Sequence, residues 1–141
     1  MPWPDRIRFV VASPAVHLAT SDSRRVLPDV VPRGDAVFNL QRALLLVQAL
    51  QHGSFADVRE ALRDRWHQPF RAAIVPGFTE LLALEHPGLL GVCLSGSGPS
   101  VLALCVDAEE SVSAAISAVY DRLGVPCVVR RLEAHQPGIL A

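Results

Sequence analysis

The stretch from Gly91 to Leu104, GVCLSGSGPSVLAL, decides the fold because six small, polar or turn-forming residues separate two apolar runs. The apolar runs, one ending at Leu94 and the other starting at Val101, have the composition of β-strands. Gly96 and Gly98 can adopt a positive φ, which costs other residues about 1–2 kcal/mol. We therefore expect two neighbouring strands joined by a tight loop over residues 95–100.

This loop is larger than a β-hairpin needs. A two-residue Asn-Gly or Asp-Gly turn joins antiparallel strands, and here the connection contains Ser95, Gly96, Ser97, Gly98, Pro99 and Ser100. Because the glycines leave the backbone bare, the loop could approach another surface or an anion closely. Two interpretations stay open at this point: a purely structural turn, or one half of a phosphate site.

The first part of the chain is typical of one strand followed by helices. Residues 7–13 predict a strand, and Thr20 or Ser21 is expected to be the N-cap of a short helix that Pro28 ends. Residues 35–52 are apolar on nearly every side, which predicts a largely buried helix that ends at Gly53.

A second helix should begin at Ser54 and turn its apolar residues, Trp66 included, toward the core. Its solvent side would then hold the charged residues Arg59, Glu60, Arg63 and Asp64. Residues 67–71 break the helical period. A helix from about Pro76 to Leu84 is expected next, and after the two strands of the opening stretch come a helix over 108–123 and a strand over 127–132.

The order strand, helices, strand, strand, helix, strand predicts an α+β fold with a single domain over 1–141. It matches a ferredoxin-like β-α-β-β-α-β unit with extra helices in the first crossover. Two right-handed crossovers would place the helices on one face of an antiparallel sheet. In this arrangement the loop over 95–100 joins the second strand to the third.

The composition excludes several classes of function. Half of the 141 residues are hydrophobic and 19% are charged, which favours a folded domain. Apolar runs such as 43–47 are too short to span a membrane, and no signal peptide is recognisable. All 13 basic residues are arginine, so no lysine can serve a Walker-type loop or a Schiff base. A net charge of −1 disfavours nucleic-acid binding.

The cysteines and histidines form no metal motif. Cys93, Cys105 and Cys127 are an odd number and lie in or beside strands, which predicts buried free thiols in a reducing cytoplasm. The five histidines lack the spacing of metal ligands, and His67 is expected to be structural. No Gly-x-Ser-x-Gly elbow surrounds the serines of the loop. We therefore expect neither a metal site nor a catalytic residue in this chain.

Four segments together resemble a known family. LSGSGPSVLAL is similar to the third motif of the galactokinase, homoserine kinase, mevalonate kinase and phosphomevalonate kinase superfamily. The segments RFVVASPAVHLATSDSRRVLP, DAVFNLQRALLLVQAL and HQPFRAAIVPGF resemble, in the same order, the C-terminal half of the homoserine kinase family. The resemblance extends from about Arg8 to about Glu133. It implies that the 95–100 loop braces a nucleotide loop and closes the site around the γ-phosphate.

The resemblance implies phosphorylation of L-homoserine by ATP and Mg²⁺, a step of threonine biosynthesis in the cytoplasm. In the family an N-terminal half holds ATP and Mg²⁺ on a Pro-x-x-x-Gly-Leu-Gly-Ser-Ser loop, which no segment here matches. We therefore expect the substrate-side half of the enzyme without its ATP-binding domain, inactive alone. It would pair with an N-terminal half, or self-associate through the face bearing the 95–100 loop. The alternatives are a stand-alone module that binds a small amino acid and a non-functional remnant.

The resemblance also implies substrate-binding residues. The substrate arginines of the family fall on Arg24, in TSDSR, and on Arg71, in QPFR. A guanidinium fork suits the homoserine carboxylate, and such charge-assisted hydrogen bonds contribute about 1.5–3 kcal/mol. Thr20 is either a hydroxyl of the substrate site or a helix cap. Asp22 and Ser23 stand where the family usually has Glu and Ala.

Overall fold

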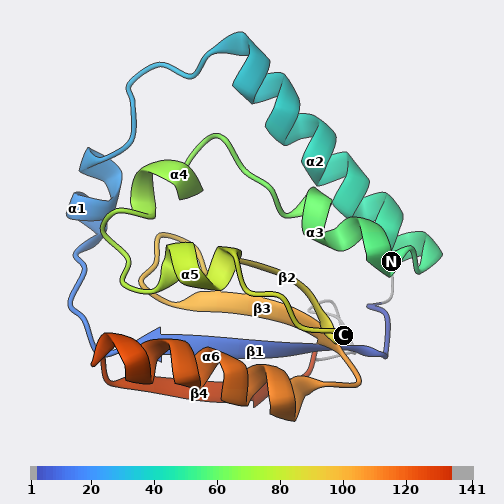
Figure 1. Ribbon diagram of the computed structural model, residues 1–141. Helices are drawn as coiled ribbons and strands as arrows, with labels where there is room; N and C mark the ends of the chain where they lie inside the picture. The colour runs from blue at the N-terminus through green and yellow to red at the C-terminus, as the bar shows by residue number, and fades with distance from the viewer. Residues whose placement is uncertain (1–2, 135–141) are drawn as a thin grey trace, which may run out of the picture.

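The computed structural model describes residues 3–134 and contains a four-stranded antiparallel sheet flanked by helices (Figure 1). The strands are β1 (Ile7–Pro14), β2 (Leu89–Leu94), β3 (Val101–Val106) and β4 (Cys127–Leu132), and their order in the sheet is β2-β3-β1-β4. The first and third strands are therefore central, as in a ferredoxin-like unit. The expected α+β class and strand positions are confirmed.

The helices between β1 and β2 are more numerous than expected, and those after α2 are short. They are α1 (Thr20–Arg25), α2 (Arg33–His52), the 3-10 turn η1 (Phe55–Asp57), α3 (Val58–Ala61), α4 (Gln68–Arg71) and α5 (Phe78–Leu82). A single helix, α6 (Glu109–Leu123), connects β3 to β4. Gly53 ends α2 in the left-handed conformation with φ 69°, as its position after the apolar run predicted.

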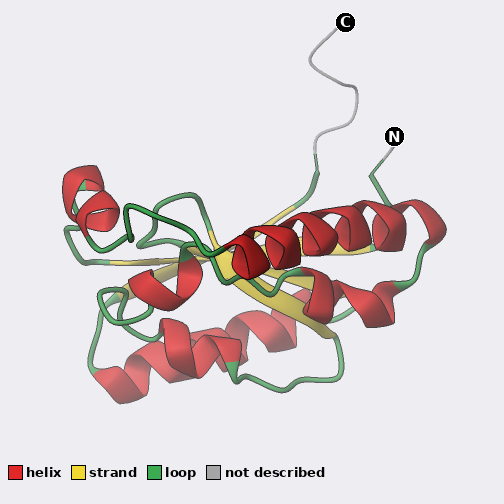
Figure 2. Cartoon of the chain, turned by 90° about the horizontal axis from the view of Figure 1, so that it is seen from above, coloured by secondary structure: helices red, strands yellow, loops and turns green. Residues whose placement is uncertain are grey.

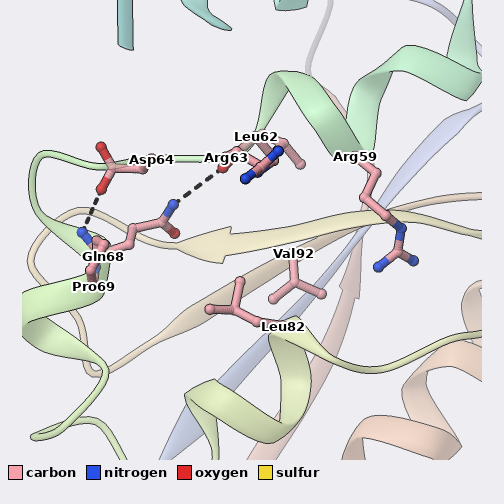
Figure 3. Close-up of a pocket in the computed structure, with 8 residues that line it drawn as sticks. All are labelled: Arg59, Leu62, Arg63, Asp64, Gln68, Pro69, Leu82 and Val92. Atoms are coloured by element: carbon pink, nitrogen blue, oxygen red, sulfur yellow. Dashed lines mark hydrogen bonds between the residues drawn. The ribbon is translucent and has the colours of Figure 1, made fainter. Parts of the chain in front are cut away.

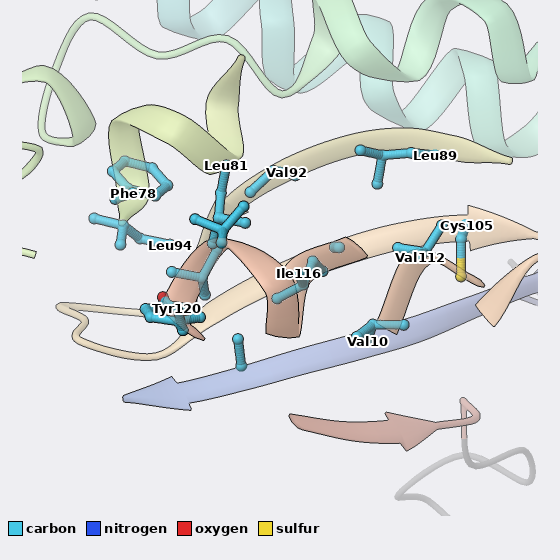
Figure 4. Close-up of a cluster of buried hydrophobic side chains, with 14 of the residues drawn as sticks. Val10, Phe78, Leu81, Leu89, Val92, Leu94, Cys105, Val112, Ile116 and Tyr120 are labelled. Atoms are coloured by element: carbon cyan, nitrogen blue, oxygen red, sulfur yellow. The ribbon is translucent and has the colours of Figure 1, made fainter. Parts of the chain in front are cut away.

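Helices cover both faces of the sheet, so the prediction of one covered face is wrong. The cluster on the α5 and α6 side is built around Phe78, Ile116 and Tyr120 (Figure 4). The cluster on the opposite face contains Ile7, Ala49, Leu50, Val58 and Leu104. Figure 2 shows α2 and α6 on opposite sides of the sheet. The cause is β3, whose sequence VLALCV is apolar at every position, so each of its faces needs a cover.

Helix α2 is not largely buried, contrary to the prediction from its all-round apolar composition. Only Ala49 and Leu50 are buried, whereas Leu40 and Leu44 are 64% and 61% exposed. The C-terminal end of α2 packs on η1, α3 and the second cluster. The outer side of the helix is left without a neighbour among the described residues.

The single helix predicted from Ser54 toward Trp66 is interrupted. The carboxylate of Asp64 accepts hydrogen bonds from the N–H groups of Trp66, His67 and Gln68 and turns the chain into α4. Trp66 consequently lies 50% exposed instead of facing the core. Asp64 was expected in solvent, but its side chain is only 8% exposed. The break predicted at 67–71 is thus the start of a helix, with a proline in its first turn.

Two other helix starts also differ from the prediction. The N-cap of α1 is Ala19, not Thr20 or Ser21, and its carbonyl accepts the N–H groups of Asp22 and Ser23. Helix α5 begins after Gly77, whose φ is 77°. The helix therefore starts later than the predicted Pro76, and a Cβ at Gly77 would lie 3.0 Å from the ring of Tyr120.

Candidate functional site

The predicted site residues lie on three segments at one end of the sheet: α1, α4 and the β2–β3 loop (Figure 1). Gly96 and Gly98 in the loop have φ values of 63° and 79°, as predicted. A Cβ at Gly98 would lie 3.2 Å from Val75 and 4.0 Å from Leu18. Because Leu18 comes shortly before α1, the loop and the start of α1 are neighbours.

The tip of the β2–β3 loop leaves backbone donors unused. The Ser95 N–H donates to the Ser100 carbonyl at 2.9 Å, and the Ser100 hydroxyl lies 3.1 Å from that of Ser13 in β1. The N–H groups of Gly96 and Ser97 make no hydrogen bond within residues 3–134. No atom would lie within 4 Å of a Cβ at Gly96, so the tip is open to an external group.

Arg71 is the best-positioned of the predicted site residues. It is 8% exposed, and its Nε donates to the Ser23 carbonyl at 3.1 Å, which ties α4 to α1. Its Nη1 lies 3.0 Å from Nδ1 of His67. A guanidinium only donates, so Nδ1 of His67 is the acceptor and the ring is neutral with its proton on Nε2. Nη2 of Arg71 has no hydrogen-bond partner in the described part of the chain and is the donor left for a ligand.

The surroundings of His67 and Asp64 set the protonation states of these two residues. Burial lowers the pKa of His67, Asp64 opposes that change, and Arg71 adds to it, so the pKa lies below 6.5. Burial raises the pKa of Asp64, but the N–H groups of Gln68 and His67 and the amide of Asn39 outweigh it and bring the pKa below its ordinary value. At neutral pH we therefore expect an uncharged His67 beside an ionised Asp64.

The other predicted substrate residues lie on α1. Thr20 and Arg24 are both exposed, and they share one face of the helix because they are four residues apart. Thr20 makes no side-chain capping bond, so its interpretation as a helix cap is wrong. Between them Ser23 is fully buried, and its hydroxyl has no partner within the described residues. The structure thus brings Arg71 onto the backbone of the residue that precedes Arg24.

Sequence reasoning missed Asp64 and Gln68. Gln68 is buried, its Nε2 donates to the Leu62 carbonyl at 3.2 Å, and its Oε1 accepts the Leu94 N–H at 2.8 Å. One side chain therefore satisfies part of the open edge of β2. The segment DRWHQP, an aspartate ahead of a proline in a first helical turn, is a signal that could have identified Asp64. No local signal announces the contact of Gln68 with β2.

A pocket of about 460 Å³ lies along the outer edge of β2 (Figure 3). It is lined by Arg59, Leu62, Arg63, Asp64, Gln68, Pro69, Leu82 and Val92. Both arginines are engaged: Arg59 donates to the carbonyl of Leu89 at 3.3 Å, and Arg63 pairs with Glu60 at 3.0 Å. Thr20, Arg24, Arg71 and the loop do not line this pocket. Because its lining offers a carboxylate no unengaged cation, we do not assign it as the substrate site.

The three cysteines differ in burial. Cys105 is buried, whereas Cys93 and Cys127 are partly buried, so the prediction of buried free thiols holds in full for Cys105 alone. Burial raises the pKa of Cys93 and of Cys105 to about 11.

Within residues 3–134 no group of three or more His, Cys, Asp or Glu could hold a metal ion. None of the helices in that range is long and apolar enough to cross a membrane.

Comparison with known proteins gives consistent results. Residues 46–123 match the family described as "GHMP kinases C terminal". The homoserine kinase of Schizosaccharomyces pombe is 41% identical over 133 residues, which cover 90% of this chain and 39% of that protein. The homoserine kinase of Aquifex aeolicus is 38% identical over 141 residues, or 99% of this chain and 48% of that protein.

A solved structure also matches nearly the whole of this chain. The crystal structure of homoserine kinase from Cytophaga hutchinsonii has a TM-score of 0.89 and 26% identity, and covers 96% of this chain and 44% of that one. The chain therefore spans between about two fifths and one half of the length of the relatives it matches.

Replacing Asp64 by asparagine should destabilise the domain. The neutral amide oxygen is a weaker acceptor for the N–H groups that start α4, so Asp64→Asn should lower the free energy of unfolding by about 1–3 kcal/mol at neutral pH. Urea unfolding followed by circular dichroism measures this difference. Asp29→Asn, at an exposed loop position, is the matched control and should change little. Equal effects of the two substitutions would contradict the role of Asp64.

The state of His67 predicts an acid-dependent loss of stability. Its pKa in the folded chain lies below the ordinary value of 6.5, so the unfolded chain binds the proton more readily. The free energy of unfolding should then fall as the pH falls below about 6.5. His67→Asn, whose amide oxygen can replace Nδ1 as an acceptor without titrating, should flatten this dependence, whereas His52→Asn on exposed His52 should not. Identical pH profiles for both variants and the parent would refute the assignment.

Proposed function

The chain belongs to the GHMP kinase C-terminal family, and on that premise we propose that it is the substrate-side domain of a homoserine kinase. Such an enzyme transfers the γ-phosphoryl group of ATP to the hydroxyl of L-homoserine. A shared fold does not fix a substrate. The proposal therefore draws on the 41% and 38% identity to homoserine kinases along nearly the whole chain, and on the geometry of Arg71.

The environment of Arg71 is the observation that carries the proposal. Its guanidinium is buried, yet it forms no ion pair with any carboxylate within residues 3–134. Buried charges are normally paired, so this site favours an external anion. Ser23 and His67 hold Nε and Nη1, which leaves Nη2 as an oriented donor with little freedom to lose on binding. The carboxylate of homoserine, a small zwitterion, fits this requirement.

The remaining site residues are assigned around Arg71. Arg24, on the adjacent helix α1, supplies a second positive charge, and Thr20 supplies a hydroxyl one turn earlier. The loop over 95–100 closes the site on the phosphate side with the N–H groups of its tip. No residue of this chain is proposed to remove a proton, because phosphoryl transfer depends mainly on positioning and on electrostatic stabilisation.

ATP and Mg²⁺ are proposed to be held mainly outside this chain. Two observations support this: the sequence contains no lysine that could reach a phosphate of ATP, and residues 3–134 contain no group of three or more His, Cys, Asp or Glu that could hold a metal ion. The polypeptide of 141 residues should then lack turnover on its own. Threonine biosynthesis and a cytoplasmic location belong to the same proposal, and the free thiols of Cys93, Cys105 and Cys127 support a reducing compartment.

Activity should appear when this chain is joined to the N-terminal part of a homoserine kinase, and it should depend on Arg71. We define the fusion protein as the N-terminal part of the Aquifex aeolicus homoserine kinase, up to the matched region, joined to Met1 of this chain. It should phosphorylate homoserine in a coupled ADP-release assay, whereas the isolated chain should not. Arg71→Lys removes the planar fork and should raise the KM for homoserine about tenfold or more, with the KM for ATP unchanged.

Arg25→Lys is the matched control for this experiment, because Arg25 is exposed on α1 beside Arg24 and already pairs with Asp22. It should leave both KM values close to those of the parent fusion protein. Turnover by the isolated chain, or a KM for homoserine that is indifferent to Arg71→Lys, would contradict the proposed function.

A further inference from the structure

The outer side of α2 carries a stripe of exposed aliphatic residues. Val37, Leu40, Leu44 and Val47 are 45%, 64%, 61% and 45% exposed. Their spacing of three, four and three residues aligns them on one side of the helix, as in helices that pack against another helix. At 1.5 Å of rise per residue the stripe is about 15 Å long. We call this set of four residues the α2 stripe.

The side of α2 that holds the stripe is also uncharged between positions 34 and 51. The charged residues in that range turn toward the protein: Asp35 pairs with Arg65 at 3.5 Å, and Arg42 pairs with Glu60. The other exposed residues are small or carry amides, namely Gly34, Gln41, Ala43, Gln48 and Gln51. A helix that faces solvent normally has charged and polar residues on that side. The α2 stripe therefore has the composition of a contact surface.

We infer that the α2 stripe docks the N-terminal part of the homoserine kinase polypeptide, through a helix with apolar residues at matching spacing. This inference rests on the proposed function. The region that resembles this chain makes up 44% of the Cytophaga hutchinsonii homoserine kinase, so more than half of such a chain remains to be packed. Both faces of the sheet are already covered by helices of this chain, whereas the α2 stripe is not.

The entry point of the chain favours the same occupant. Trp3, the first described residue, packs against the cluster that contains Ala49 and Leu50 of α2. In the fusion protein, a segment joined ahead of this chain would therefore start near this helix. Covalent continuity in the fusion protein makes docking intramolecular, with an effective concentration of the order of millimolar for short links. A second copy would have to form a stable contact through one short stripe without that advantage.

The self-association expected for the isolated chain stays a prediction, and the α2 stripe offers a surface for it. The six residues of the 95–100 loop include no large apolar side chain, so the loop is the less favourable surface.

Substitutions on the α2 stripe test the inference. Leu44→Glu should lower the melting temperature of the fusion protein by more than about 5 °C, and Leu44→Ala should lower it less but in the same direction. In the isolated chain, at a concentration where it is monomeric, neither should change the melting temperature by more than about 2 °C. Val128→Glu, at a 52% exposed position on β4, is the matched control and should have small effects in both proteins.

Hydrogen exchange provides a readout without substitutions. The amides of residues 37–47 should exchange more slowly in the fusion protein than in the isolated chain. Equal exchange, or equally small effects of Leu44→Glu in both proteins, would overturn the inference. A fusion protein that does not unfold cooperatively would also overturn it. A fusion protein that sediments as a dimer, and that Leu44→Glu dissociates, would overturn it too and would assign the α2 stripe to contact with a second copy.

The two proposals fail in different ways. A fusion protein that phosphorylates homoserine but is indifferent to Leu44→Glu would refute the docking inference and leave the proposed function standing. A fusion protein that Leu44→Glu destabilises but that has no turnover with homoserine would refute the proposed function alone.

Discussion

The candidate site depends on one buried carboxylate. Asp64 lies after the end of α3, accepts three consecutive backbone N–H groups, and starts α4 in a new direction. The direction of α4 then places two side chains: Gln68 on the edge of β2, and Arg71 on the backbone of α1. Burial alone would disfavour an ionised Asp64, but the donors around it offset that cost and bring its pKa below the ordinary value.

This arrangement fixes the guanidinium of Arg71 through Nε and Nη1 and leaves Nη2 available. The neutral ring of His67 and the carbonyl of Ser23 hold Arg71 without neutralising its charge, since neither is an anion. A carboxylate partner within the chain would stabilise the domain but would compete with a ligand. The observed partners orient the cation and keep its charge for an external group. An anion that binds there, and only to the folded state, stabilises that state by an amount that grows with its concentration relative to its Kd.

The sequence predicted the features that depend on local patterns. The four strands follow from short apolar runs between turn residues, and the loop over 95–100 follows from Gly96 and Gly98, whose positive φ values were expected. The position of helix α2 was predicted correctly, but its burial was not. Periodicity shows that one side of a helix is apolar, and it cannot show whether the described residues include a partner that covers that side. The contact of Ser23 with Arg71 joins residues 48 positions apart, so no local pattern could reveal it.

The two arginines were identified as a pair by resemblance to a family and not by their spacing. The structure adds a physical connection between their segments, through Ser23, and shows that Arg71 is buried while Arg24 is exposed. For the proposed function, we assign different tasks to these different environments: Arg71 would orient a carboxylate, and Arg24 would contribute charge from a more exposed position. The central claim is therefore that the charge of the ligand carboxylate is recognised at Arg71.

Calorimetry with the fusion protein tests this claim most directly, by comparing homoserine with its carboxamide, in which a neutral amide replaces the carboxylate. The account predicts that the carboxamide binds at least about tenfold more weakly, because a charge-assisted bond to the guanidinium is lost. Equal affinities for the two ligands would contradict it.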